Sequence, residues 1–251
     1  MRKALVNGCL VLLMIPAVLM VYFWYTLWHA ENENDRRQRA ASDSLLRQAR
    51  DATDRTADVL DGSGDTGTDA VLGVIWKHTG SPVISYDEER RVFTAVALRT
   101  AEYEQESVVL VMGPGRVERC FVHTFRRRPG PAWTSQVTER NVGACRESRD
   151  IGNSVRYARS RTGDMDAARM TRADVQRVLD PLDPLSGERR IDVRSVVREG
   201  RRVVAVVLFR DRYRVPEETS APIEQCYRLT RVLGIEGGTV QPVTAVPVAA
   251  C

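Results

Sequence analysis

Residues 119–145 read RCFVHTFRRRPGPAWTSQVTERNVGAC, and residues 225–251 read QCYRLTRVLGIEGGTVQPVTAVPVAAC. In both stretches the second and the last residue are cysteines 25 positions apart, Cys120 with Cys145 and Cys226 with Cys251. Aligned without gaps from cysteine to cysteine, seven of 26 positions are identical. The shared spacing predicts two disulfides, Cys120–Cys145 and Cys226–Cys251, in an oxidising compartment. There is no close C-x-x-C pair, which argues against a zinc site.

The sequence upstream of each cysteine pair also corresponds. AVALRTAEY (95–103) aligns with AVVLFRDRY (205–213). TDAVLGVIWKH (68–78) and TRADVQRVLD (171–180) both read as short helices begun by a threonine cap. We therefore predict an α+β fold made of two related disulfide-bonded units, each a short helix plus antiparallel strands. Chance similarity between valine-rich strands remains the alternative.

Alternating and β-branched runs bounded by turn residues predict the strands. The predicted strands are 90–103, 107–113, 118–125 and 136–145 in the first unit, and 201–213, 225–234 and 239–248 in the second. The first two are expected to pair as a hairpin. Pro242 and Pro247 exclude the last strand from the centre of a sheet. The stretch 154–190 is polar and is expected to be helical in part.

An apolar segment lies close to the N-terminus of the sequence. Residues 4–30, ALVNGCLVLLMIPAVLMVYFWYTLWHA, contain no Asp, Glu, Lys or Arg. A helix of this length, roughly 40 Å, crosses a bilayer core of about 30 Å. Arg2 and Lys3 precede it, and an aromatic cluster at 22–28 marks the other end. The positive-inside rule predicts a single-pass signal anchor, with a cytoplasmic N-terminus and an extracytoplasmic C-terminal region.

Two other interpretations of this segment fit less well. A cleaved signal peptide needs small residues before the cut, and Trp28 lies three residues before the candidate cut after Ala30. A lipoprotein signal ending at Cys9 would need the apolar run before that cysteine, whereas the run follows it. We therefore expect the anchor to remain uncleaved.

The segment after the anchor is charged and rich in helix formers. Leu45, Ala49, Ala52, Thr56 and Val59 form a thin helical stripe, which predicts a solvated stalk with at most weak self-association. DGSGDTGTD then resembles a calcium loop, but Thr66 and Leu72 stand where an EF-hand needs Gly and Glu. A flexible linker is the better interpretation. The predicted organisation is a cytoplasmic stub (1–3), the anchor (4–30), a helical stalk (31–60), a Gly/Asp linker (61–69), a first α+β unit (70–150) and a second (151–251).

Composition restricts the class of partner. The net charge is +4, and Arg2 and Lys3 supply two of those charges. The remainder is nearly neutral, which argues against a nucleic-acid binder. Lysine occurs only at positions 3 and 77, and with abundant Ala, Val, Asp and Gly this suggests a GC-rich genome such as that of an actinobacterium.

No catalytic motif is found. The histidines are His29, His78 and His123, and none stands at a metal-ligand or nucleophile-activating spacing. Glu102, Glu104 and Glu106 alternate at a strand end. They could form a glycosidase acid pair, but a solvated face is the simpler interpretation. We therefore expect no enzyme activity, no cofactor and no metal.

A possible contact patch lies at one hairpin tip. Arg126, Arg127 and Arg128 are followed by Trp133, and we expect this tryptophan to be exposed beside them. Such a group suits an anionic wall polymer, a lipid headgroup or an acidic protein. We expect a membrane-anchored extracytoplasmic binding or scaffold protein of the bacterial cell envelope. The alternatives are an accessory or sensor subunit of a membrane complex, and a wall-directed hydrolase with an unrecognised site.

Overall fold

The chain has an α+β fold with a long N-terminal helix, two antiparallel four-stranded sheets and two disulfides. This computed structural model describes residues 2–64, 67–106, 113–128, 132–166, 170–179, 190–211, 223–232 and 242–251, with side chains from Met14 onward. Two compact units are formed. The smaller unit contains Met1–Arg47 and Thr100–Glu118, and the larger unit contains Gln48–Arg99 and Arg119–Cys251. The predicted boundary at 150/151 falls inside the larger unit.

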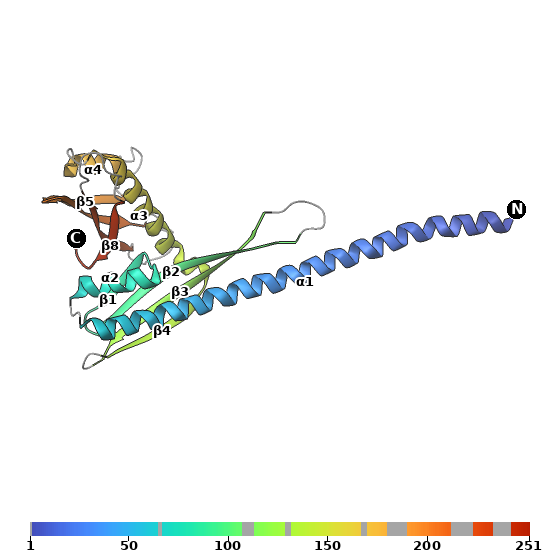
Figure 1. The fold of residues 1–251 in the computed structure, drawn as a ribbon, viewed down its shortest axis with the longest axis horizontal. Coiled ribbons are helices and arrows are strands. Elements are labelled where there is room, and N and C mark those ends of the chain that lie inside the picture. Colours follow the sequence, from blue (N-terminus) through green and yellow to red (C-terminus); the bar gives the residue numbers. More distant parts are fainter. Residues whose placement is uncertain are drawn as a thin grey trace, which may run out of the picture. The chain divides into compact units, whose positions relative to one another are not determined.

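The elements follow one another in a simple order (Figure 1). They are α1 (Arg2–Ser63), α2 (Thr68–Thr79), β1 (Val83–Asp87), β2 (Val92–Tyr103), β3 (Gly115–Arg127), β4 (Trp133–Arg140), a 3-10 helix η1 (Val142–Cys145), α3 (Arg146–Asp164), α4 (Arg172–Leu179), β5 (Ile191–Glu199), β6 (Arg202–Arg210), β7 (Glu224–Val232) and β8 (Thr244–Val248). Each sheet takes its four strands in chain order, β1-β2-β3-β4 and β5-β6-β7-β8.

The C-terminal part of α1 belongs to the larger unit. Ala49, Thr53, Thr56 and Leu60 recur at spacings of four, three and four, and all four are buried. The predicted stripe is therefore correct at Leu45, Ala49 and Thr56, which are buried, whereas Val59 is 36% exposed. Small residues on this face let α1 approach the first sheet closely. Residues 61–63, assigned by sequence to the linker, continue α1.

The first sheet packs one face against helices. Its core contains Leu60 of α1, Val71, Leu72 and Ile75 of α2, Ile84 of β1, Phe93 and Ala95 of β2, Phe125 of β3 and Trp133 of β4. Phe93 lies between two aromatic neighbours, with ring centroids 4.2 Å from Tyr86 and 5.8 Å from Trp133. Apolar burial of this kind is the main stabilising term in such a core.

The second sheet is covered by α3 and α4 (Figure 1). Its core consists of Val83, Ile151, Val155, Ala158, Val175, Leu179, Ile191, Val193, Ala205, Val207, Phe209, Tyr227, Leu229, Val243 and Ala245. Ile151, Val155 and Ala158 recur at helical spacing, so α3 buries one stripe on the sheet. The opposite face of α3 remains in solvent.

The two sheets are joined inside the larger unit. Helix α2 packs against β8. The Gln225 side chain accepts a hydrogen bond from Ile84 N at 3.0 Å and donates one to Val248 O at 3.3 Å. The Tyr227 hydroxyl donates to Pro82 O at 2.6 Å. Ile84 of β1 and Pro82 just before that strand are thus bonded to side chains of β7, and these hydrogen bonds connect the two sheets.

In the smaller unit, two side chains of α1 bind the segment that follows β2. The Asn34 side chain donates to Glu106 O at 2.8 Å and accepts from Glu106 N at 2.7 Å. Arg37 pairs with the Glu106 carboxylate at 2.6 Å and donates to Glu104 O at 3.2 Å. This part of the β2–β3 connection is therefore docked on α1. The predicted strand 107–113 lies, up to residue 112, outside the described residues.

The predicted anchor (4–30) is described with side chains only from Met14 onward. Among those residues, no helix is both long enough and apolar enough to cross a membrane. Residues 4–13 of the predicted anchor lie outside that part.

Candidate functional site

Sheet topology brings two turns to one end of the first sheet. In an antiparallel meander, the β1–β2 turn and the β3–β4 turn lie at the same end of the sheet. A backbone hydrogen bond links the two turns, because Arg127 N donates to Arg91 O at 3.2 Å. Arg90 and Arg91 therefore join the predicted patch. We call Arg90, Arg91, Arg126, Arg127 and Arg128 the arginine end.

Most of this charge faces solvent. The Arg90 side chain is 78% exposed, and Arg91, Arg126 and Arg128 are also exposed, whereas Arg127 is half-buried. Arg90 forms a long 3.8 Å ion pair with Asp87. No ion pair within 4 Å is found for the other four arginines among the described residues. The acidic residues of the β1–β2 turn, Asp87 to Glu89, reduce the net charge without removing the surplus.

Arg91 adopts an unusual backbone conformation. Its φ is 52°, and no other non-glycine residue in the described ranges has a positive φ. The left-handed region costs a residue with a Cβ of the order of 1 kcal/mol. Asp87 stabilises the turn by accepting a hydrogen bond from Arg90 N at 3.0 Å.

The structure corrects the interpretation of Trp133. We expected an exposed indole beside the arginines, but Trp133 is only 8% exposed and packs against Phe93 in the core. Its position at the start of β4 explains the difference. The backbone N donates to the Asp61 carboxylate of α1 at 2.7 Å, which fixes this residue above the helix. The indole of Trp133 is therefore not part of the exposed surface, and the arginines are what remains of the predicted patch.

His123 is buried between β3 and helix α1. Its exposed fraction is 0%, and Nδ1 lies 2.7 Å from Thr53 Oγ1. Thr53 donates its hydroxyl hydrogen to Ala49 O at 2.7 Å, so we assign the imidazole proton to Nδ1. Nε2 then has no hydrogen-bond partner in the described part of the chain. Burial, followed by the positive charge of Arg99, lowers the pKa of His123 to about 4.

The three glutamates do not form an acid pair. Glu106 is engaged by Asn34 and Arg37, and the backbone of Glu104 is also bonded to Arg37. Glu102 is exposed on β2. Over the ranges that the structure covers, no group of three or more His, Cys, Asp or Glu residues is placed to hold a metal ion.

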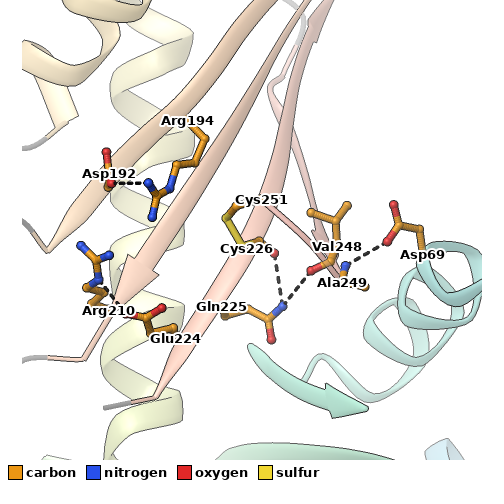
Figure 2. Close-up of a disulfide and its surroundings, with 10 residues drawn as sticks. All are labelled: Asp69, Asp192, Arg194, Arg210, Glu224, Gln225, Cys226, Val248, Ala249 and Cys251. Carbon is orange, nitrogen blue, oxygen red and sulfur yellow. Dashed lines mark hydrogen bonds and ion pairs between the residues drawn. A yellow bond between two sulfur atoms is a disulfide. The ribbon is translucent and has the colours of Figure 1, made fainter. Parts of the chain in front are cut away.

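Both predicted disulfides are present, but their surroundings differ. Cys120 and Cys145 are fully buried, whereas Cys251 is exposed and Cys226 is half-buried. Figure 2 shows the Cys226–Cys251 bond and, beside it, Asp69 of α2 accepting a hydrogen bond from Ala249 N at 2.9 Å. Asp69 also pairs with Arg228 at 3.1 Å. The end of the chain described here is therefore held to β7 and to α2.

Sequence reasoning found three of the five residues of the arginine end. Arg90 and Arg91 were missed because they are separated from Arg126 by a complete hairpin. A predicted four-strand meander would have placed the two turns together. However, the β1 strand, which creates the first turn, is only five residues long and was not predicted.

Comparison with known proteins gives no relative. No family model matches the chain, and neither a curated protein nor a solved structure matches it.

Proposed function

We propose that this protein is a membrane-anchored extracytoplasmic binding module of the bacterial cell envelope, and that its arginine end contacts an anionic wall polymer or an acidic envelope protein. The observation that carries the binding role is the arginine end itself. Two turns that are distant in sequence place five guanidinium groups at one end of a sheet. Arginine suits this role because its planar fork binds carboxylate and phosphate groups.

The membrane anchor is supported by sequence and by exposure. Residues 4–30 contain no charged side chain, and the whole stretch is helical in α1. From Met14 to Trp28, large apolar side chains are exposed around the helix, among them Met20 at 73% and Trp24 at 71%. A helix that is apolar all round is normally buried in a membrane or a core. Arg2 and Lys3 favour a cytoplasmic N-terminus.

The disulfides and the two sheets support an extracytoplasmic, duplicated module. Disulfides persist mainly in oxidising compartments. In each sheet one cysteine lies on the third strand and its partner follows the fourth, with a separation of 25 residues. We infer that the two sheets are related by duplication. In the sequence of the second unit, the stretch that corresponds to residues 126–128 is rich in glycine and has no arginine cluster.

Topology is tested first. Single cysteines at exposed positions of the larger unit, such as Ser85→Cys, should react with a membrane-impermeant maleimide in intact cells. Carbonate washing should leave the full-length protein in the membrane. Release by carbonate would exclude the anchor, and labelling only after lysis would exclude the orientation.

Binding is tested with charge variants. We expect Arg126→Gln/Arg128→Gln to reduce retention on an isolated cell-wall fraction or on an acidic partner found by proximity labelling. The matched control is Arg198→Gln/Arg202→Gln, at the β5–β6 turn of the second sheet, where both residues are exposed. Retention should also fall steeply between about 50 and 200 mM salt, because exposed charge pairs are screened. Equal loss in both variants would reject a specific role for the arginine end.

A further inference from the structure

A second polar surface feature lies at the C-terminal end of helix α3. An open hollow of about 360 Å³ is lined by the last two turns of α3 and by the segment before β8. Its lining residues are Arg156, Arg159, Ser160, Gly163, Asp164, Pro242 and Val243. The volume is at the low end of the range for small-molecule sites, about the size of one small ligand.

The hollow carries two arginines, Arg156 and Arg159. In the described ranges, neither Arg156 nor Arg159 has a carboxylate within 4 Å. Arg159 Nε donates to Val243 O at 3.0 Å, which fixes the guanidinium while its terminal nitrogens remain without a protein partner in those ranges. Arg156 donates to the Asn153 amide oxygen. Two fixed positive groups at one hollow favour an anionic ligand.

The C-terminus of α3 lies beside the hollow, and its carbonyl groups affect the binding of an anion. A helix C-terminus carries partial negative charge, which normally repels anions. Here Arg231 of β7 donates to Thr162 O at 3.0 Å and also to Met165 O. Two carbonyl groups at this helix end are therefore bonded to a cation. This contact also ties the last turn of α3 to the second sheet.

The remaining lining residues favour a sugar over a bare anion. Ser160 supplies a hydroxyl group, and the Asp164 carboxylate can accept hydrogen bonds from ligand hydroxyl groups while repelling a bare anion. Pro242 is exposed at the rim of the hollow and supplies an apolar surface suited to the C–H face of a sugar ring. We propose that this hollow binds a sugar unit that carries a phosphate or carboxylate group. The proposal adds a second site and does not require the arginine end to bind anything.

The test uses the full-length protein in detergent micelles, titrated calorimetrically with glucose 6-phosphate. Glucose and inorganic phosphate are the component controls. We expect glucose 6-phosphate to bind about ten-fold more tightly than either, because only it engages both the arginines and the hydroxyl-binding groups. Equal affinity for inorganic phosphate would overturn the proposal in favour of simple ion pairing.

Variants separate the hollow from the general charge of α3. Arg156→Gln/Arg159→Gln should weaken binding about ten-fold or more, whereas Arg146→Gln/Arg149→Gln in the first turn of the same helix should not change it. Gly163→Leu offers a second approach. A Cβ at Gly163 would lie 3.8 Å from a Val243 methyl, an ordinary contact, so a larger side chain can enter the hollow without displacing the backbone. Unchanged binding in Gly163→Leu would place the ligand elsewhere.

Competition between glucose 6-phosphate and an anionic wall polysaccharide distinguishes a free sugar from a sugar unit of a polymer. An anionic wall polysaccharide that competes at a lower concentration of sugar units than glucose 6-phosphate would identify a wall polymer. Equal competition per sugar unit would identify a free sugar phosphate. If glucose 6-phosphate does not bind to the full-length protein, the hollow is rejected as a site. If retention through Arg126 and Arg128 is still observed in that case, the proposed function stands.

Discussion

His123 shows how one polar residue is accommodated in an apolar core. Its neighbours are the sheet on one side and Thr53 of α1 on the other. The neutral ring is tolerated because Nδ1 has a partner. The protonated ring would bury a charge close to Arg99 and would place a second N–H where no acceptor is described. Burial of such a charge is costly, which explains the low pKa.

The low pKa predicts acid sensitivity. The pKa of His123 is about 4 in the folded chain and 6.5 in the unfolded chain, so the unfolded state binds the additional proton between these values. The free energy of unfolding should therefore fall as the pH drops from about 6.5 to 4, by about 3 kcal/mol at most. Chemical denaturation at several pH values measures this loss.

The second sheet supplies the matched control. Leu229 stands at the position of the cysteine-aligned stretch that corresponds to His123, and it is equally buried. We expect His123→Leu to remove most of the pH dependence over the same range. Thr53 keeps its hydrogen bond to Ala49 O in this variant. A variant with the same acid profile as the natural chain would assign the sensitivity to other groups.

At the scale of elements, the two disulfides make a natural comparison. Both close loops of the same length, so the chain-entropy model gives each about 3.5 kcal/mol. They differ in burial, since Cys120 and Cys145 lie in the core and Cys251 is exposed. The loss of buried sulfur atoms leaves a cavity, whereas exposed atoms are replaced by water.

Removal of each pair should reveal this difference. We expect Cys120→Ala/Cys145→Ala to lower the free energy of unfolding by about 1 kcal/mol or more beyond the loss in Cys226→Ala/Cys251→Ala. Denaturation curves of the two double variants give the comparison. Asp69 still bonds Ala249 N in the second variant, which retains the end of β8. A larger loss in the second variant would contradict the burial argument.

Local signals predicted some elements and missed others for identifiable reasons. Thr171 caps α4 as expected, because its hydroxyl accepts from Asp174 N. The same signal placed the start of α2 only approximately, since Gly67 is the N-cap and Thr68 lies inside the helix. Strand β5 was not predicted, because a bulge between Val193 and Ser195 breaks the alternation of buried and exposed residues.

At the scale of the molecule, α1 contributes to more than one part of the fold. The sequence identified a long helical segment but could not show that Ala49 to Leu60 lie in the core, because the partners of those residues are distant in sequence. The same limitation applies to the candidate site. The arginines were visible in the sequence, but the burial of Trp133 and the proximity of Arg91 depend on tertiary packing.

The role of α1 in the core predicts where the chain can be shortened. Removal of residues 1–44 should leave both sheets folded, whereas removal of residues 1–63 should prevent folding, because Thr53 and Leu60 would be lost. Circular dichroism and cooperative thermal unfolding distinguish these outcomes. If α1 were only a solvated stalk up to residue 60, both shortened chains would unfold at the same temperature.

The order of the disulfides has a consequence for biogenesis. After Cys9, each bond joins cysteines that follow one another along the chain, Cys120 with Cys145 and then Cys226 with Cys251. In the proposed orientation Cys9 lies in the membrane, and translocation delivers Cys145 before Cys226. If each newly translocated cysteine pairs with the unpaired cysteine that precedes it, the two native disulfides form directly. Maturation should therefore require an oxidant but no disulfide isomerase, and pulse-labelled chains in isomerase-deficient cells should acquire both bonds at the normal rate.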